Sequence, residues 1–135
     1  MNIQAGIFWI ILTVFYEARG EDAVGQKNVA KVILNRAHKN NWPIENIVKA
    51  RKQFSCYNDG IKNSNPLLWI KEIETLVTVV RNVDRAVDEW MEGDNLDGAT
   101  HYYAPKGMAG GKPPYWAASM KKIGKFGNHI FYREG

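Results

Sequence analysis

The chain has 135 residues, of which 45% are hydrophobic and 24% are charged; this composition is typical of a folded globular protein and excludes a disordered one. Because ~100–150 residues is the commonest domain size, we expect residues 1–135 to form a single domain with one site. The formal net charge is +4, and residues 101–135 hold six lysines or arginines against one glutamate. This basic last third indicates either a polyanionic partner, such as nucleic acid, an anionic membrane surface or an acidic cell-wall polymer, or a solvated lysine-rich face.

The first predicted element is a buried helix within residues 1–16, which contain the apolar run AGIFWIILTVF. The run lacks the marks of a signal peptide, because no lysine or arginine precedes Arg19 and no small-residue cleavage site follows. At roughly a dozen residues it is also shorter than the ~20 that cross a bilayer. We therefore expect a protein made in the bacterial cytoplasm, without an export signal and without stable membrane insertion.

A second helix is predicted to open at Glu21-Asp22, since acidic residues favour a helix N-terminus. It ends near His38, a turn follows at Trp42-Pro43, and a short helix is predicted over residues 44–50. The apolar stripe of the second helix comprises Val24, Val29, Val32, Ile33 and Leu34.

Residues 51–65 lose the helical period and are predicted to form a loop, a kind of segment that often carries function. A long helix, or a broken helix pair, is predicted from Asn65-Pro66 to Gly93. Residues 98–105 are predicted to form a short strand, and residues 120–133 a hairpin. The predicted fold class is α+β, mostly helical with a small antiparallel β element.

No metal site is expected, because His38, His101 and His129 are far apart in the sequence and no HxxxH, HExxH or CxxC spacing occurs. Cys56 is expected to be a small buried side chain. A nucleophilic role for it, with His101 or His129 as base, is the less favoured alternative, because nothing near it in the sequence lowers the pKa of a thiol. Residues 107–111 match neither a Walker loop nor a dinucleotide-binding turn, so no cofactor is expected.

The carboxylates are the stronger candidates for catalysis, and Glu17 is the first of them. A general acid that works near neutral pH needs a pKa above the ordinary ~4.3 of Glu, and desolvation by apolar neighbours is the usual cause. Glu17 follows the apolar run and stands beside aromatic residues. The alternative for Glu17 is an ion pair with Arg19 or Arg36 at a helix junction. The alternative for Glu21 is a stabilising charge at a helix N-terminus.

Several sequence blocks occur in an order that resembles a known family. They are YEARGED followed by AVGQKNVAKVILNRA, then QFSCYNDG, GATHYYAP and KFGNHIFY, and they extend from about Phe15 to Tyr132. The pattern is similar to the SleB-type cell-wall hydrolase family, the catalytic domain of bacterial spore cortex-lytic enzymes and of related phage and bacterial peptidoglycan hydrolases. This resemblance implies a lysozyme-like, lytic-transglycosylase-like domain that cleaves the β-1,4 bond between N-acetylmuramic acid and N-acetylglucosamine.

The resemblance also implies site residues. The catalytic acid of the family is the first Glu of its GEARGE motif, which maps onto Glu17, while the Gly before it is Tyr16 here. Tyr102 and Tyr103 alternate in a predicted strand, so one should face the groove and the other the core. Trp116 is expected either to stack on a sugar or to pack in the core, and His129 either to bind substrate or to be structural. The residues expected to bind substrate are Phe54, Ser55, Tyr102, Tyr103, Trp116 and His129.

The number of carboxylates bears on the reaction type. A hydrolytic glycosidase usually needs two, and Asp59, Asp94 and Asp97 lie in predicted loops without supporting aromatic residues. A lytic transglycosylase needs one, which protonates the leaving oxygen and then helps the muramic C6 hydroxyl attack C1. We therefore expect a transglycosylase that forms 1,6-anhydro-muropeptides. A hydrolytic muramidase or an amidase is the alternative on the same substrate, and a non-catalytic basic protein that binds nucleic acid or the envelope is the alternative from another class.

The expected partner is the glycan strand of peptidoglycan, with no nucleic acid bound and a monomeric chain. The family's spore enzymes carry a signal peptide and a separate wall-binding domain, and neither is visible in this sequence. The chain in this respect looks like a phage endolysin that serves host lysis and that a holin, a membrane-lesioning partner, releases to the cell wall. A bacterial or prophage enzyme fits the sequence equally well.

Overall fold

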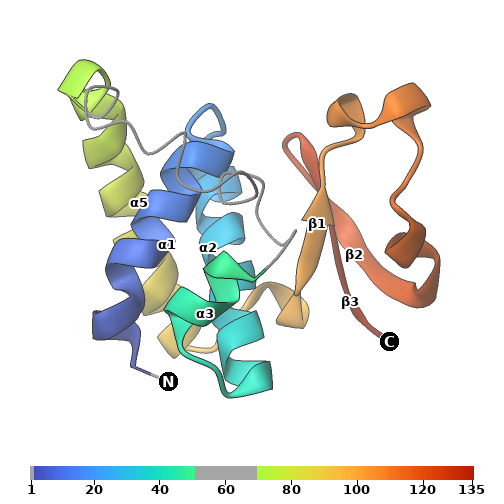
Figure 1. Ribbon diagram of the computed structural model, residues 1–135, viewed down its shortest axis with the longest axis horizontal. Helices are drawn as coiled ribbons and strands as arrows, with labels where there is room; N and C mark the ends of the chain where they lie inside the picture. The colour runs from blue at the N-terminus through green and yellow to red at the C-terminus, as the bar shows by residue number, and fades with distance from the viewer. Residues whose placement is uncertain (1, 51–69) are drawn as a thin grey trace.

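A computed structural model describes residues 2–50 and 70–135, and Figure 1 shows helices on one side and a small sheet on the other. The predicted loop from Arg51 onward, with Phe54, Ser55, Cys56 and Asp59, lies outside the described residues. The described helices are α1 (Ile3–Ala18), α2 (Ala23–Asn40), α3 (Ile44–Lys49) and α5 (Ile73–Met91), and the strands are β1 (His101–Tyr103), β2 (Met120–Phe126) and β3 (His129–Glu134).

Helix α1 is the buried helix that the apolar run predicts. Its N-terminus is capped by Asn2, whose side chain accepts a hydrogen bond of 3.2 Å from the Ala5 amide. Ile10, Val14 and Phe15 are fully buried in the main core cluster, which α1 shares with α2, α3 and α5. Among the described residues, no helix combines the length and the apolar content that a membrane span requires.

Helix α2 is buried along most of the segment from Gly25 to Ala37, and its predicted stripe is confirmed except at one residue. Val29 and the apolar residues after it are fully buried, whereas Val24 is 48% exposed. Counting back from Val29 by three and four residues leads to Gln26 and Gly25, and these two lie on the buried face instead. The helix ends two residues later than predicted, at an Asn41 cap in the left-handed region (φ 52°).

Helix α5 packs along α2, and ion pairs join the two. The Glu89 carboxylate accepts hydrogen bonds of 2.7 Å from both Lys27 and Lys31, and these bonds lower the pKa of Glu89 to about 2. Lys31 also lies 3.1 Å from Asp94, just beyond the end of the helix. The predicted end of this helix near Gly93 is confirmed within two residues.

The sheet has the strand order β1-β3-β2, and both pairings are antiparallel. The predicted hairpin is confirmed, and it turns at Gly127 and Asn128. Gly127 has φ +60°, which suits a two-residue hairpin turn with glycine at its first position. The fold class is α+β, as predicted, although the predicted strand at residues 98–105 is only three residues long.

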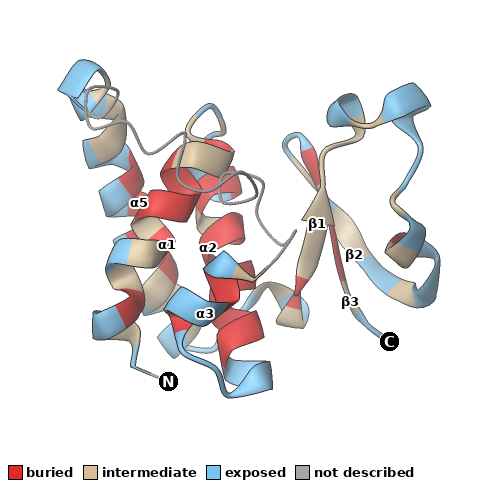
Figure 2. Cartoon of the chain, in the orientation of Figure 1, coloured by how far each residue is buried: buried red, intermediate tan, exposed pale blue. Residues whose placement is uncertain are grey.

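The helices and the sheet meet along one seam. A second core cluster joins Val32 of α2 to Ala99 before β1 and Phe131 of β3, all fully buried. Figure 2 shows the buried residues concentrated in the helices, where the main core cluster lies, while β2 and the short helices around residues 105–119 are mostly half-buried or exposed. The polar side chains at the seam are therefore the ones to inspect for function.

Candidate active site

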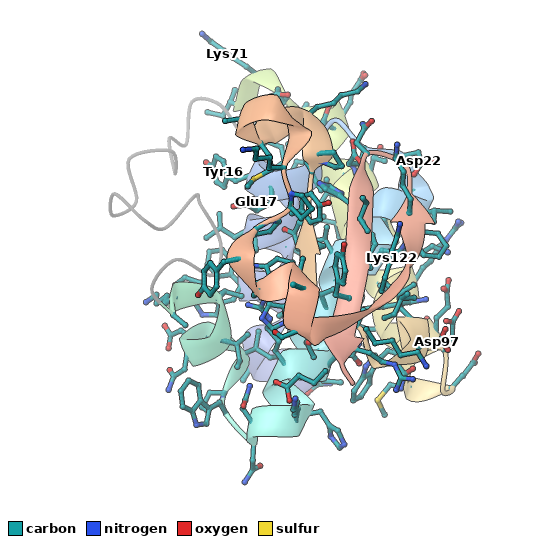
Figure 3. All side chains as sticks on the ribbon, turned by 90° about the vertical axis from the view of Figure 1, so that its right-hand side faces the viewer. Tyr16, Glu17, Asp22, Lys71, Asp97 and Lys122 are labelled. Carbon is teal, nitrogen blue, oxygen red and sulfur yellow. The ribbon has the colours of Figure 1, made fainter. Side chains whose placement is uncertain are left out.

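Glu17 lies near the C-terminal end of α1, on a helix that is tightly packed. Phe15 before it is fully buried, and Ala18 after it is 2% exposed. The rings of Phe15 and Tyr16 meet edge to face, with centroids 5.2 Å apart. Figure 3 shows Tyr16 and Glu17 beside each other at the end of α1, and Glu17 is partly buried. The apolar run therefore holds a half-buried carboxylate at a rigid helix end.

The two arginines considered as partners for Glu17 have described contacts elsewhere. The Nε of Arg19 lies 3.3 Å from the carboxylate of Glu72, and its guanidinium stacks on the Phe15 ring at 5.3 Å. The Nε of Arg36 donates to the carbonyl of Thr100. Burial lowers the pKa of Arg36 to about 10, so its guanidinium stays charged at neutral pH.

Glu21 has a different role from the helix N-terminal charge that its position predicts. Asp22 caps α2, because its carboxylate accepts a hydrogen bond of 2.8 Å from the Gly25 amide. The Glu21 carboxylate instead accepts hydrogen bonds from the side chain of Asn128 at 2.8 Å and from the backbone amide of Asn128 at 3.3 Å. Glu21 thus ties the loop between α1 and α2 to the turn of the β-hairpin.

His129 lies between the two glutamates and the sheet. Its side chain is buried, and its Nδ1 is 3.4 Å from a Glu21 oxygen, in a geometry that is not a hydrogen bond. Its ring packs against Tyr102 with centroids 4.9 Å apart. Burial lowers the pKa of His129, and the negative charges of Glu21 and Glu17 oppose this shift without cancelling it. The imidazole is therefore neutral at neutral pH.

Gly25 and Gln26 explain how the loop that holds Glu21 is fixed. A Cβ on Gly25 would lie 2.8 Å from the Cβ of Glu21, so only glycine leaves room for this loop conformation. The Gln26 amide donates to the carbonyls of Arg19 and Glu21, both at 3.3 Å, and its oxygen accepts a hydrogen bond of 2.8 Å from Asn82 of α5. The loop is thus held from α2, α5 and the hairpin together.

Asn35 fixes the chain that leads into β1. The Asn35 amide donates to the carbonyls of Asn95 and Ala99, both at 2.8 Å, and its oxygen accepts a bond of 2.8 Å from the Trp90 indole. Together with the bond from Arg36 to Thr100, these contacts set the position of β1 against α2.

The sheet places the predicted substrate-binding residues on two faces. Tyr102 and His129 point toward the helices, where Tyr102 also packs on Phe131. Tyr103 lies on the opposite face, as strand alternation requires, and stacks on Tyr132 at 6.0 Å. Trp116 joins this outer cluster, with its ring 5.4 Å from Tyr132, which favours the packing role considered for it. The structure therefore groups Glu17, Tyr102 and His129 and separates Tyr103 and Trp116 from them.

A family model described as cell wall hydrolase matches residues 20–132. The chain belongs to the cell wall hydrolase family. A curated relative, the spore cortex-lytic enzyme of Halalkalibacterium halodurans, is 32% identical over 138 residues, and the alignment covers 96% of this chain but only 37% of that protein.

Two solved structures are similar to this cell wall hydrolase domain. The catalytic domain of the germination-specific lytic transglycosylase SleB from Bacillus anthracis is 26% identical, with a TM-score of 0.67 over 92% of this chain and 90% of that one. The catalytic domain of the Bacillus cereus SleB protein is also 26% identical, with a TM-score of 0.69 over 96% and 91%. The predicted family and its fold are thus confirmed.

The sequence blocks that indicated the cell wall hydrolase family meet at one place in the structure. Gln26 of the second block and Asn128 of the last both donate hydrogen bonds to Glu21 of the first block, and Gly25 and His129 lie close against Glu21. The position of Glu17 after the apolar run and the family resemblance predicted Glu17 and His129 as site residues, but the sequence gave no reason to join Glu21 to Asn128. Glu17 itself lies just before the matched range, so its catalytic role stays a prediction.

The other carboxylates considered as partners for Glu17 do not lie beside it, as far as the structure describes them. Asp94 is paired with Lys31. Figure 3 shows Asp97 at the far end of the molecule from Glu17. Within residues 2–50 and 70–135, no group of three or more His, Cys, Asp or Glu residues is arranged to hold a metal ion.

Proposed function

We propose that this cell wall hydrolase domain cleaves the MurNAc–GlcNAc bond of peptidoglycan as a lytic transglycosylase, with Glu17 as its proton-transfer residue. The similarity to a solved catalytic domain of a lytic transglycosylase supports the reaction class. The observation that carries the proposal is the state of the two glutamates at the end of α1: Glu17 is half-buried at the seam, whereas both oxygens of Glu21 accept bonds from Asn128. Glu21 is thus occupied in holding the loop, and we assign the reacting carboxyl to Glu17, which occupies the position of the family's catalytic glutamate.

A single carboxyl group suffices for this reaction. Glu17 first donates its proton to the glycosidic oxygen while the bond from that oxygen to the muramic C1 breaks. The resulting carboxylate then accepts the proton of the muramic C6 hydroxyl as that oxygen bonds to C1, and the product is a 1,6-anhydro sugar. The attack is intramolecular, so no bound water has to be positioned by a second carboxylate.

His129 and Tyr102 are proposed to shape the site around Glu17. The buried, neutral His129 adds no positive charge beside the glutamates. Tyr102 packs on its ring and fixes its orientation. We also propose substrate contacts for Phe54 and Ser55, as the family resemblance implies, and for the outer-face aromatics Tyr103 and Trp116, as their residue types imply. Host lysis, release by a holin and a monomeric state stay predictions of the sequence.

The proposal is tested with Glu17→Gln, which keeps the shape of the side chain and removes its acidity. General acid catalysis contributes about 10²–10⁴-fold, so clearing of purified peptidoglycan should slow by that factor. Glu92→Gln, at an exposed position past the end of α5, is the matched control and should leave the rate unchanged. Circular dichroism checks that both variants are folded.

The products decide between the alternatives on this substrate. Mass spectrometry of the wild-type digest should show anhydro-muropeptides; reducing muramic ends would identify a hydrolytic muramidase, and free stem peptides an amidase. A non-catalytic envelope-binding or nucleic-acid-binding protein would instead release nothing and show salt-dependent polyanion binding that is indifferent to Glu17.

A further inference from the structure

A polar cavity lies on the same seam as Glu17, at its other end. It has a volume of about 150 Å³ and lies where the end of α2 meets α3 and the start of β1. Its lining includes the polar residues Arg36, Lys39 and His101 and the apolar residues Trp42, Ile47 and Ala50. The cavity is small for a drug-sized ligand and suits one sugar residue.

Contacts along the seam connect this cavity to the proposed active site. Helix α2 and strand β3 run in the same direction, with the Glu21–Asn128 contact at one end and the Lys39–Glu134 ion pair at the other. The residues from His129 to Glu134 span about 17 Å in a strand. His101, which lines the cavity, lies on the opposite face of β1 from Tyr102, and its ring packs near Trp116 at 5.0 Å. An extended glycan strand that passes Glu17 therefore reaches the cavity within a few sugar rings.

The charges around the cavity favour a neutral ligand over an anion. Lys39 is neutralised by Glu134, and Arg36 donates to the carbonyl of Thr100. Burial and the nearby Arg36 lower the pKa of His101 to about 4, so its ring is uncharged at neutral pH. The cavity also lies at the C-terminal end of α2, where the helix dipole repels negative charge.

The apolar side of the cavity has the composition of a sugar-binding surface. Trp42 is 52% exposed, and it lines the cavity together with the aliphatic Ile47, which is almost fully buried. A flat indole beside hydrogen-bonding groups provides both an apolar surface and polar partners. We propose that this cavity is a subsite for one acetylated amino-sugar residue of the glycan strand, remote from the bond that is cleaved. This inference rests on the proposed function, since it assigns a second part of the same substrate.

A remote subsite predicts that binding depends on glycan length. Long strands reach both Glu17 and the cavity, whereas a disaccharide reaches only one of them. Binding energy from the remote part improves the use of long substrates alone. Loss of the subsite should therefore raise KM on long strands and leave short fragments unaffected.

Two variants with different physical effects test the subsite. Trp42→Ala removes the indole, but Trp42 also lines a neighbouring hollow with Trp9 and Ile44. Ala50→Trp fills the first cavity alone, because Ala50 does not line the second. Tyr115→Ala is the matched control, since this aromatic residue is 95% exposed and lines neither cavity.

Binding is measured in the Glu17→Gln background by titrating the tryptophan indole NMR signals with N-acetylglucosamine hexamers and dimers. The Trp42 signal should shift when hexamers are added. Trp42→Ala and Ala50→Trp should each weaken hexamer binding roughly tenfold, about 1.4 kcal/mol, and should leave dimer binding unchanged. Unchanged hexamer binding in both variants would overturn the subsite, even if the wild type cleaves peptidoglycan. If the Trp42 indole signal shifts with hexamers but the wild-type protein cleaves no glycan, the subsite is supported and the proposed function is refuted.

Discussion

Gly25→Ala is a change that should disturb the site without touching any residue proposed to contact substrate. The added Cβ would lie 2.8 Å from the Cβ of Glu21 and 3.4 Å from the carboxylate of Asp22. The Glu21 Cβ is attached directly to the backbone, so the loop itself has to move. Such a movement draws the Glu21 carboxylate away from Asn128, to which it is bonded at 2.8 Å.

The expected change in the free energy of unfolding is the sum of one stabilising and two destabilising contributions. Alanine stabilises a helix relative to glycine by up to ~1 kcal/mol. The forced contact opposes this, since overpacking costs ~1–3 kcal/mol, and a hydrogen bond to a charged group is worth ~1.5–3 kcal/mol. Because the bond from Asn128 is exposed, its value lies at the low end. We expect Gly25→Ala to lower the free energy of unfolding by about 2 kcal/mol, roughly a 30-fold change in the unfolding equilibrium.

Gly20→Ala provides the matched control, because a Cβ there meets nothing within 4 Å. Urea unfolding of both variants measures the difference, and peptidoglycan clearing should fall in Gly25→Ala alone. In an Asn128→Ala background the cost of Gly25→Ala should shrink, because the bond that it disrupts is already gone. Equal unfolding midpoints for Gly25→Ala and Gly20→Ala would refute the reasoning that a Cβ at position 25 displaces Glu21.

Three further changes test the fold around the seam. Because the pKa of His101 is lowered in the folded protein, the unfolded chain takes up the His101 proton at a higher pH than the folded chain does. The contribution of His101 to the free energy of unfolding is therefore complete above pH 6.5 and is lost toward pH 4, by about 1–2 kcal/mol after a discount for partial exposure. His101→Gln should flatten this pH dependence, which urea unfolding measures. Gly6→Ala would place a Cβ 2.5 Å from the side chain of Ile44, so α1 and α3 should separate. The overpacking should cost ~1–3 kcal/mol of stability and lower the melting temperature, and an unchanged melting temperature would contradict this contact. Trp90→Phe leaves the buried oxygen of Asn35 without its indole donor and should cost ~1–3 kcal/mol in urea unfolding, and a neutral result would mean that water replaces the donor.

Local patterns were sufficient to predict the elements but not the contacts between them. The period of apolar residues identified α1 and α2, and the turn residues identified the hairpin. Val24 was wrongly placed in the buried stripe because the prediction relied on its apolar side chain and not on its position along the helix. The small Gly25 and the polar Gln26 occupy the inward positions instead. The helical period leads from Val29 back to these two positions, so the error came from reading the stripe by residue type alone.

The candidate site also depends on contacts between elements that local sequence patterns did not predict. Acidic residues before a helix predict a local role for Glu21, whereas its partner Asn128 is 107 residues away in the chain. Strand alternation correctly separated Tyr102 from Tyr103, but the face that each takes is set by the packing of Phe131 and Val32 in the second core cluster. Long-range pairs of this kind depend on the tertiary fold, which is why the sequence resembled the family without revealing how its blocks meet.

The acidic residues at the end of α1 differ in what they do for stability, and this difference leads to a last prediction. Asp22 caps α2 and Glu21 binds the hairpin, so both contribute to the fold. Glu17 lies near the C-terminal end of α1, where the helix dipole disfavours a negative charge. The last turn itself has no basic residue, and Arg19 follows it as the C-cap, where its guanidinium donates a hydrogen bond of 3.5 Å to the Phe15 carbonyl. If Glu17 serves catalysis, its negative charge at this position costs α1 some stability. We therefore expect Glu17→Gln to unfold at the same urea concentration as the wild type or a higher one, by up to ~1 kcal/mol, while peptidoglycan clearing is lost. A loss of stability of more than ~1 kcal/mol would show that Glu17 holds the fold together, and the catalytic assignment would then need another carboxylate.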